Sequence, residues 1–544
     1  MTISGEDLLI TGGRVYTADP RQPWAQALLI HGDRIRYIGS EADARAHAGG
    51  RVEQLRLPGA LVLPGLNDSH IHTDWGGHAL RMLNLEGVVS VQELQERLRH
   101  YAQTHPDQEW IEGTGLGYEA LMQDAAPRLT LDAAVSDRPV YLRALDWHTA
   151  WANSQALQRA GITRGADVPL PNEVAVNAEG NATGLLKERL AFILVEDCMP
   201  ALSASEEEDA LVAAMRYLNS MGITSVQNMH GDPALLDRYL RLHEQQRQTV
   251  RAQHYLRVRD DTSPAYLPEV AERARRQAGS WNQVAGIKMF IDGVVESKTA
   301  MLLDPYGDGS GDLGVPDMDP ALHRAFTLQA DALGLQVATH AIGDRGVRCT
   351  LDAYEAAATA NGPGRRHRVE HIELLHAGDL PRFARLGVIA SMQPLHCAPT
   401  IDPYLTPYTE LIGSQRLPAS FLWRSLLESG ALLAFGSDWP IVTPDVRQGL
   451  HVAVTRTNVA GEPPGGYEPQ QCVTLAQALD AYTRGAAYAE HQEHEKGVLR
   501  AGMLADVTVF SRDLFAHGQE GILGAKIVLT MVGGRVVYRD DTAS

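Results

Sequence analysis

The sequence predicts an α/β protein with three parts: a (β/α)8 TIM barrel, a composite β-sandwich from both chain ends, and a subdomain inserted after the first barrel strand. Three observations support this fold class. Eight apolar, strand-like segments alternate with helical patterns through the middle of the chain. Segment 12–16 (GGRVY) is nearly repeated at 533–538 (GGRVVY). The interval 87–205, between the first two barrel strands, is too long for one crossover.

Short strands separated by turns occupy the first sixty residues and return at the far end of the chain. Glycine-containing turns such as 31–33 separate them, as in β-hairpins. We therefore expect residues 1–60 and 495–544 to build one sandwich. The candidate strands are 8–10, 14–17, 27–30, 34–39, 505–510 and 526–538.

The barrel is expected to occupy residues 61–86 and 206–494. The insert, 87–205, contains a strand-like segment at 139–143 and the pair Trp147-His148. Helical patterns cover 206–221, 320–333 and 346–359. The eight strand segments are 61–66, 223–229, 251–258, 286–291, 336–340, 368–371, 388–393 and 432–437.

Composition restricts the function. The 544-residue chain has a net charge of -19, which leaves no basic stripe for phosphates and argues against a nucleic-acid partner. No apolar run approaches the ~20 residues that span a bilayer, and residues 1–7 lack the basic and apolar regions of a signal peptide. The 4 cysteines are far apart and expected to be reduced, so we expect a cytoplasmic protein.

Metal-binding residue types mark the ends of several predicted strands. The first segment leads into His70 and His72, and the i, i+2 spacing of an extended chain places both imidazoles on one face. Imidazole is a common protein ligand for zinc-like ions. Each residue alone has an ordinary structural explanation, but together at the carboxyl ends of barrel strands they predict a metal site. The later members are Lys288, His340, His371 and Asp438.

These segments resemble the amidohydrolase superfamily, and within it the amidohydrolase family 3 branch, which includes N-substituted formamide deformylases. The resemblance runs from the amino-terminal sandwich to Val537. The His-x-His start is shared by the whole superfamily, whereas Trp147-His148 and segment 292–297 indicate the branch. The segments that carry the resemblance are 63–72 (LPGLNDSHIH), 146–154 (DWHTAWANS), 292–297 (DGVVES), 339–344 (THAIGD) and 436–440 (GSDWP).

The resemblance implies two divalent ions, which we expect to be zinc. Lys288, carboxylated by CO2 to a carbamate, would bridge them, because carbamylation converts a buried cation into a carboxylate-like anion. Glu296 is the rival bridge. The implied ligands are His70, His72 and Asp438 for one ion and His340 and His371 for the other.

The resemblance also implies catalytic roles. Asp438 would take a proton from the attacking water and return it to the departing nitrogen. His148, on the insert, would stabilise the oxyanion or is a structural histidine. His230, at the end of the second strand, would contact the metal ligands and not the metal itself. The histidines without a motif, expected in solvent, are His31, His254, His376, His491 and His494.

Aromatic residues flank these motifs. We expect Trp75, Trp147 and Trp439, together with Glu296, to bind substrate. Because no arginine cluster lies near the motifs, the expected partner is a small, largely uncharged amide with a hydrophobic or aryl group. Alternatives are a deaminase or an ester or lactone hydrolase on the same scaffold, or an inactive barrel used for binding. We expect neither nucleic acid nor membrane as a partner, and assembly into a homo-oligomer stays open.

Overall fold

The computed structural model describes residues 7–48, 52–121, 124–144, 147, 149–169, 172–397 and 408–540. By its contacts the chain divides into two compact units, residues 1–72 with 215–544 and residues 73–214. The first unit contains the barrel and the sandwich. The domain bounds expected from the sequence stay a prediction.

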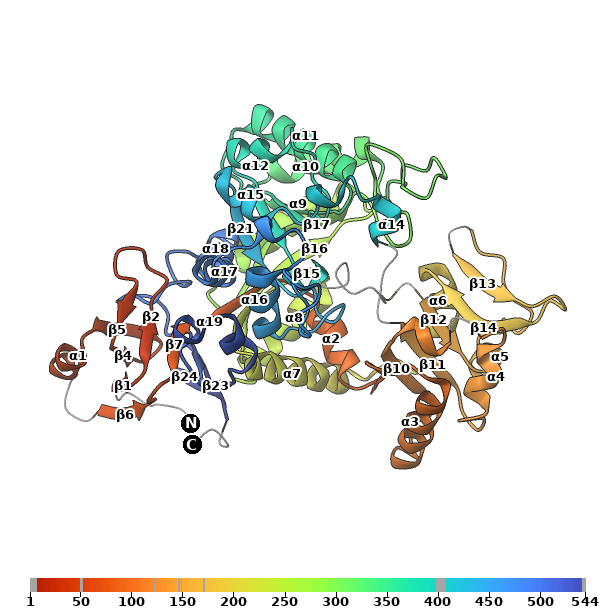
Figure 1. Ribbon diagram of the computed structural model, residues 1–544, viewed down its shortest axis with the longest axis horizontal. Coiled ribbons are helices and arrows are strands. Elements are labelled where there is room, and N and C mark those ends of the chain that lie inside the picture. Colours follow the sequence, from red (N-terminus) through yellow and green to blue (C-terminus); the bar gives the residue numbers. More distant parts are fainter. Residues whose placement is uncertain are drawn as a thin grey trace. The chain divides into compact units, whose positions relative to one another are not determined.

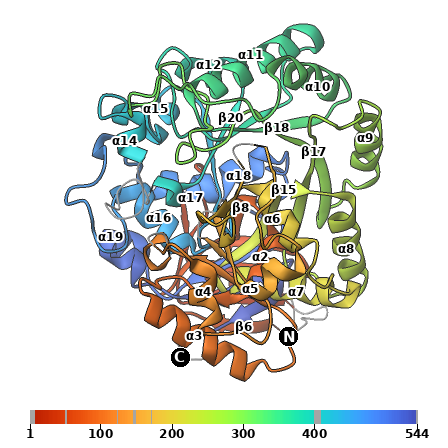
Figure 2. The same ribbon diagram turned by 90° about the vertical axis from the view of Figure 1, so that its right-hand side faces the viewer.

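Eight parallel strands follow one another in chain order around the barrel (Figure 1). Figure 2 shows helices α8 to α12 outside these strands. The sheet closes at its carboxyl end, where Asp438 N–H donates to the His70 carbonyl at 2.7 Å and His72 N–H donates to the Trp439 carbonyl at 2.9 Å. The barrel is thereby confirmed. Its strands are β8 (Leu66–Ile71), β15 (Ile223–Gly231), β16 (Arg251–Arg257), β17 (Asn282–Phe290), β18 (Gln336–Ala341), β19 (Arg368–His371), β20 (Ile389–Met392) and β21 (Leu432–Phe435).

The prediction of segment 61–66 as the first barrel strand is wrong. β7 (Leu61–Pro64) belongs to the sandwich, and the barrel begins with β8. Pro64 has no N–H to donate to a ladder. The N–H of Gly65 donates instead to the Asp506 carbonyl at 2.8 Å, and a side chain on Gly65 would overlap Thr224. The chain therefore passes from one sheet to the other at this glycine.

Two sheets from both chain ends form the sandwich, as expected. Their strand orders are β5-β4-β1-β6 and β24-β23-β22-β7-β2-β3. The repeated Gly-Gly pairs are turns: Gly12 has a φ of +83° and Gly534 a φ of 71°. The strands are β1 (Asp7–Thr11), β2 (Arg14–Tyr16), β3 (Trp24–Ala25), β4 (Ala27–His31), β5 (Arg34–Gly39), β6 (Val52–Arg56), β22 (Val507–Phe510), β23 (Ile527–Val532) and β24 (Arg535–Arg539).

The helices of this unit begin at acidic caps in several places. The side chains of Asp232 and Asp319 accept hydrogen bonds from the first turns of α8 and α10, and a proline follows each aspartate. The helices are α1 (Glu41–His47), α8 (Pro233–Glu244), α9 (Tyr266–Arg276), α10 (Pro320–Ala332), α11 (Asp344–Asn361), α12 (Leu380–Leu386), α14 (Tyr408–Ile412), α15 (Trp423–Glu428), α16 (Val446–Thr455), α17 (Leu475–Tyr482), α18 (Arg484–Ala489) and α19 (Leu514–Leu523).

The second unit has its own sheet and two hydrophobic clusters. Its strand order is β13-β14-β12-β11-β10-β9, and α7 (Ala204–Ser220) leads back to the barrel. The strands are β9 (Leu83–Asn84), β10 (Ile111–Leu116), β11 (Val140–Ala144), β12 (Thr149–Ala152), β13 (Glu173–Val176) and β14 (Ala182–Lys187). The helices are α2 (Thr73–Ala79), α3 (Val91–Thr104), α4 (Pro127–Asp132), α5 (Ser154–Arg159) and α6 (Arg189–Glu196).

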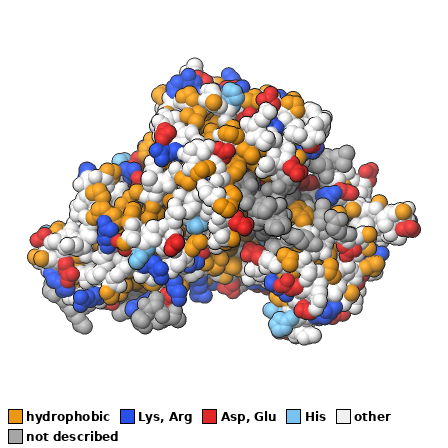
Figure 3. Space-filling model, in the orientation of Figure 1, with side chains coloured by type: hydrophobic (Ala, Val, Ile, Leu, Met, Phe, Trp, Pro, Cys, Tyr) orange, Lys and Arg blue, Asp and Glu red, His pale blue; other side chains and the backbone are white. Residues whose placement is uncertain are grey.

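The surface and the cysteines say little about where the protein is located or what it binds. Acidic and basic side chains are interspersed on the face drawn in Figure 3. Among the described residues, no helix combines the length and apolarity needed to cross a membrane. The four cysteines, all of them described, form no disulfide. The cytoplasmic location and the absence of a nucleic-acid partner stay predictions.

A buried ion pair ties the barrel to the sandwich. Arg251 starts β16, and its Nε and Nη2 donate to the two oxygens of Asp506 at 2.7 and 3.1 Å. Their side chains are 2% and 4% exposed. Removing the charge of one partner in a buried pair leaves the other uncompensated.

We predict that Asp506→Asn lowers the free energy of unfolding by about 3–5 kcal/mol. Urea unfolding followed by circular dichroism measures it. Asp513→Asn is the matched control, because Asp513 pairs with the half-exposed Arg14 and its loss should cost less than about 1 kcal/mol. Equal losses in the two variants would contradict the role of the buried pair.

Candidate metal centre

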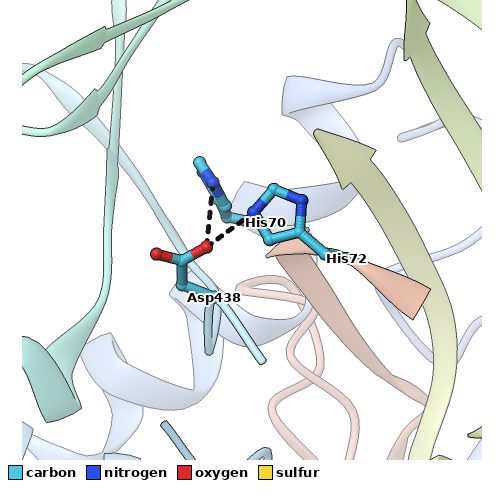
Figure 4. Close-up of side chains that lie close together, drawn as sticks. All are labelled: His70, His72 and Asp438. Carbon is cyan, nitrogen blue, oxygen red and sulfur yellow. Dashed lines mark hydrogen bonds and ion pairs between the residues drawn. The ribbon is translucent and has the colours of Figure 1, made fainter. Parts of the chain in front are cut away.

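Three side chains at the carboxyl end of the barrel form a compact group of metal-binding atoms (Figure 4). His70 lies in β8, His72 directly follows that strand, and Asp438 follows β21. Asp438 Oδ1 is 2.9 Å from His72 Nε2 and 3.3 Å from His70 Nε2. All three residues are buried, and one donor atom of each lies within 4.8 Å of the others. Two imidazoles and a carboxylate form a donor set typical of zinc-like ions.

Asp68 and Ser437 hold the two sides of this group together. Asp68 Oδ1 accepts from the backbone N–H groups of Ser437 at 2.9 Å and His70 at 3.2 Å, and Oδ2 accepts from the Ser437 hydroxyl at 2.5 Å. A side chain on Gly436 would overlap the His70 backbone. The motif residues beside the ligands therefore set where Asp438 meets the histidines.

A buried carboxylate orients His70 from behind. Glu370 Oε2 is 2.6 Å from His70 Nδ1, and Arg368 donates to the two oxygens of Glu370 at 2.5 and 3.1 Å. Burial alone would raise the pKa of Glu370, but the Arg368 guanidinium and His70 hold it below its usual range. The ionised carboxylate accepts the Nδ1–H hydrogen bond and leaves Nε2 as the metal-binding nitrogen.

The other three expected ligands lie on consecutive strands, Lys288 on β17, His340 on β18 and His371 at the end of β19. The centroid of the His371 ring is 4.7 Å from that of the His70 ring and 4.5 Å from that of the His340 ring. His340 Nε2 donates to the Gly293 carbonyl at 3.2 Å. Lys288 is fully buried, and among the described residues its Nζ has no hydrogen-bond partner. Burial lowers the pKa of Lys288 to about 7, which leaves much of the amine neutral near that pH.

The charge state of the centre fits a divalent ion. Burial lowers the pKa of His72 to about 4 and of His340 to about 3, and it lowers that of His371 well below the usual range. These imidazoles are therefore neutral, as metal ligands must be. Burial alone would raise the pKa of Asp438, but His70 and His72 hold it well below the usual range. Neutral imidazoles around an ionised carboxylate suit a divalent cation.

Sequence reasoning missed His396 and Glu373. His396 ends the short 3-10 helix Pro394–His396 after β20. Its ring stacks on that of His371, with the ring centroids 5.5 Å apart and an angle of 7° between the ring planes. His396 Nε2 is 3.5 Å from Asp438 Oδ2, and Nδ1 is 3.8 Å from Glu373 Oε1. His396 could have been predicted from the sequence, because it is a histidine three residues after the predicted seventh strand, 388–393.

Asp292 in segment 292–297 has a structural role. It is fully buried and accepts hydrogen bonds from the backbone N–H groups of Met301 at 2.9 Å, Ile342 at 3.0 Å and Gly343 at 2.9 Å. The loops that follow β17 and β18 are thereby joined beside His340. Burial raises the pKa of Asp292 to about 7.

The expected substrate-binding residues occupy different environments. Trp75 and Trp147 stack on each other in the second unit, with ring centroids 6.2 Å apart. Trp439 is buried, and its ring packs 5.5 Å from that of Tyr217. Glu296 is exposed and belongs to neither donor group found among the described residues. His148 lies outside the described residues.

The remaining histidines are mostly where we expected them. His230 lies behind the ligands, with its ring 6.0 Å from that of His72 and its Nδ1 accepting from Arg257 at 2.9 Å. His31, His376, His491 and His494 are exposed. The expectation that His254 lies in solvent is wrong, because β16 is covered on both faces and the His254 ring packs against Tyr239 at 5.0 Å.

Comparison with known proteins matches both the fold and the sequence. The model of the "Amidohydrolase family" matches residues 57–538. The chain is 32% identical to Protein LONG AFTER FAR-RED 3 of Arabidopsis thaliana, over 98% of this chain and 91% of that protein. It is 25% identical to the N-substituted formamide deformylase of Arthrobacter pascens, over 98% of both chains. An uncharacterized metal-dependent hydrolase from Pyrococcus horikoshii OT3 has a TM-score of 0.76 and 26% identity, covering 95% of this chain and 99% of that one.

The barrel, the donor group at its carboxyl end and this structural neighbour define a metal-dependent hydrolase. The chain belongs to the amidohydrolase family, which confirms the resemblance inferred from the motifs.

We predict that Glu370→Gln weakens metal binding about 10–100-fold, because a neutral amide holds the His70 imidazole less firmly than a carboxylate. Competition with a chromophoric chelator measures the affinity. Glu410→Gln, on the exposed side of α14, should bind metal as the unaltered protein does. Unchanged affinity in a folded Glu370 variant would remove this carboxylate from the role of orienting His70.

Proposed function

We propose that the protein hydrolyses the C–N bond of a small, non-peptide amide. The observation that carries the proposal is the group of His70, His72 and Asp438 at the carboxyl ends of the barrel strands, where the active sites of such barrels lie. The deformylase of Arthrobacter pascens, similar over nearly the whole chain, supports a C–N bond as the target. The intact donor group argues against an inactive barrel used only for binding.

Two steps of the reaction depend on the chain's own residues. A divalent ion, expected to be zinc, would polarise the amide carbonyl and lower the pKa of a coordinated water towards neutrality. Asp438, held ionised, takes a proton from the attacking water and then gives it to the departing nitrogen, since an amine leaves poorly without one. Glu370 and Arg368 keep His70 fixed throughout.

Lys288 is proposed to carry a carbamate, as the resemblance implies. A buried lysine without a hydrogen-bond partner among the described residues is costly as a cation. Addition of CO2 to its neutral amine forms an N–C bond and releases one proton to solvent, and the resulting carbamate is an anion that can face metal ions. The carbamate is a prediction, with Glu296 as the rival.

The substrate is proposed to be a small amide with a hydrophobic or aryl group. Trp439, which directly follows Asp438, is an aromatic residue that would favour such a group. The expectation of an uncharged substrate assumed that no arginine cluster lies near the motifs, but two arginines lie close to them in the folded chain. Arg257 and Arg259 line a cavity of about 230 Å³ together with His230. A substrate test therefore has to include an anionic amide.

The activity is tested with metal-reconstituted protein and a panel of N-benzyl formamide, neutral aliphatic amides and amides that carry one carboxylate. We expect an amine and a carboxylic acid as products, with the benzyl or aryl amides turned over fastest. Release of ammonia from a ring would instead identify a deaminase. Turnover of esters or lactones alone would identify the other alternative, and no turnover of any amide would contradict the proposal.

We predict that Asp438→Asn lowers kcat about 10²–10⁴-fold, because the amide cannot shuttle a proton. Substrate KM should change much less. Metal content is measured on the same sample so that a lost ion is not mistaken for lost proton transfer. A metal-loaded variant with near-normal kcat would remove Asp438 from this role.

We predict that Lys288→Ala loses bound metal and activity and that added acetate or propionate partly restores both, since a free carboxylate replaces the carbamate. Lys298→Ala is the control, because the half-buried Lys298 pairs with Asp308. Normal metal content and rate in Lys288→Ala would place the bridge elsewhere.

A further inference from the structure

A cavity of about 230 Å³ lies at the carboxyl ends of β15 and β16, beside the metal centre. The centroid of the His230 ring, which lines the cavity, is 6.0 Å from that of the ring of His72. The cavity therefore borders the place where the proposed reaction occurs. Its polar lining residues are His230, Asp232, Arg257, Arg259, Thr262 and Tyr266.

Arg257, the last residue of β16, is held in place by two contacts. Its Nη1 donates to His230 Nδ1 at 2.9 Å, and its guanidinium carbon lies 4.1 Å from the centroid of the Phe290 ring. The same Phe290 ring stacks on His340 with centroids 4.8 Å apart. These contacts fix the direction of the guanidinium before a ligand arrives, which lowers the entropic cost of binding one.

Arg259 lines the same cavity from the turn that follows β16. Its backbone N–H donates to the Thr262 hydroxyl at 2.8 Å, and its carbonyl accepts from the Thr262 N–H at 3.0 Å, so the turn is fixed on both sides. Among the described residues, the half-buried Arg259 side chain forms no ion pair. A guanidinium carries five N–H donors and no acceptor, so this side chain can bind an anion in the cavity.

The charge of the lining is positive. His230 accepts the Arg257 hydrogen bond at Nδ1 and is therefore a neutral imidazole. The carboxylate of Asp232 also lines the cavity, but its Oδ1 accepts from the Leu235 N–H at 2.7 Å as the cap of α8. The amino-terminal end of this helix offsets part of its negative charge. Two guanidinium groups thus face one capped carboxylate, in a chain whose net charge is -19.

We propose that this cavity is a subsite for a carboxylate, bound by Arg257 and Arg259. The planar fork of a guanidinium matches the two oxygens of a carboxylate. The inference rests on the proposed amide hydrolysis, in which a neutral amide and water give a carboxylate and an ammonium ion. The bound carboxylate is therefore either the product acid or a carboxylate substituent of the substrate, and the same two arginines recognise both.

Benzoate binding to the metal-loaded protein tests the subsite. Isothermal titration calorimetry compares the unaltered protein with Arg259→Gln, and we expect the variant to bind benzoate at least about tenfold more weakly. Benzyl alcohol, a neutral counterpart, should bind both proteins alike. Arg275→Gln is the matched control, because it removes the same charge from an arginine that is 66% exposed and pairs with Glu272 on α9. Circular dichroism verifies that each variant is folded.

Kinetics with the same proteins distinguish the two sources of the carboxylate. The value of kcat/KM is measured for an amide that carries one carboxylate and for its neutral counterpart. If Arg259→Gln lowers the ratio of these values about tenfold or more, the substrate brings the carboxylate. If the ratio stays the same and inhibition of neutral-amide hydrolysis by the product acid weakens, the product is the source. No change in either quantity would overturn a role of the cavity in the reaction.

Two binding results would overturn the subsite itself. Equal benzoate affinity in Arg259→Gln and Arg275→Gln would mean that the metal alone holds the carboxylate. An equal loss of affinity for benzyl alcohol would mean that Arg259 only packs against ligands. Amide hydrolysis without Arg259-dependent benzoate binding would contradict the subsite and leave the proposed function intact. Arg259-dependent binding without hydrolysis of any amide would support the subsite and contradict the function.

Discussion

The site depends on one contact, the closure of the barrel between the end of β8 and the segment after β21. The backbone hydrogen bonds at 2.7 and 2.9 Å that join these segments also bring the Asp438 carboxylate against His70 and His72. Asp68 reinforces the closure through Ser437. A barrel left open here would separate the carboxylate from both imidazoles, so the metal centre and the fold are completed by the same interaction.

A buried polar network carries this closure into the barrel interior. Arg368 is fully buried and contacts Glu370, Gln227, the Ser69 carbonyl and the Ser391 hydroxyl. A buried guanidinium is costly unless its donors are satisfied, and here these partners satisfy them. The network determines side-chain positions. Arg368, with its donors satisfied, holds Glu370 in place, and Glu370 in turn holds the His70 ring. Stability and ligand geometry are therefore linked at the centre of the barrel.

Much of the fold was predictable, because buried parallel strands appear as apolar runs and their carboxyl ends carry the polar residues. The boundary at Pro64 and Gly65 was not, since the apolar run 61–66 continues from β7 into the first residue of β8 and only the pairing partners separate the two strands. His396 was missed because it follows a strand within a short turn and carries no motif of its own. His254 looked unremarkable in sequence, and only the covering of β16 on both faces buries it.

The central claim is that His70, His72 and Asp438 hold a catalytic divalent ion at the barrel mouth. A crystal of zinc-reconstituted protein, with anomalous scattering recorded on both sides of the zinc edge, tests it most directly. The account predicts an edge-dependent peak within about 2.0–2.2 Å of His70 Nε2, His72 Nε2 and a carboxylate oxygen of Asp438. A fully occupied zinc peak elsewhere, with these three side chains still bonded only to one another, would contradict it.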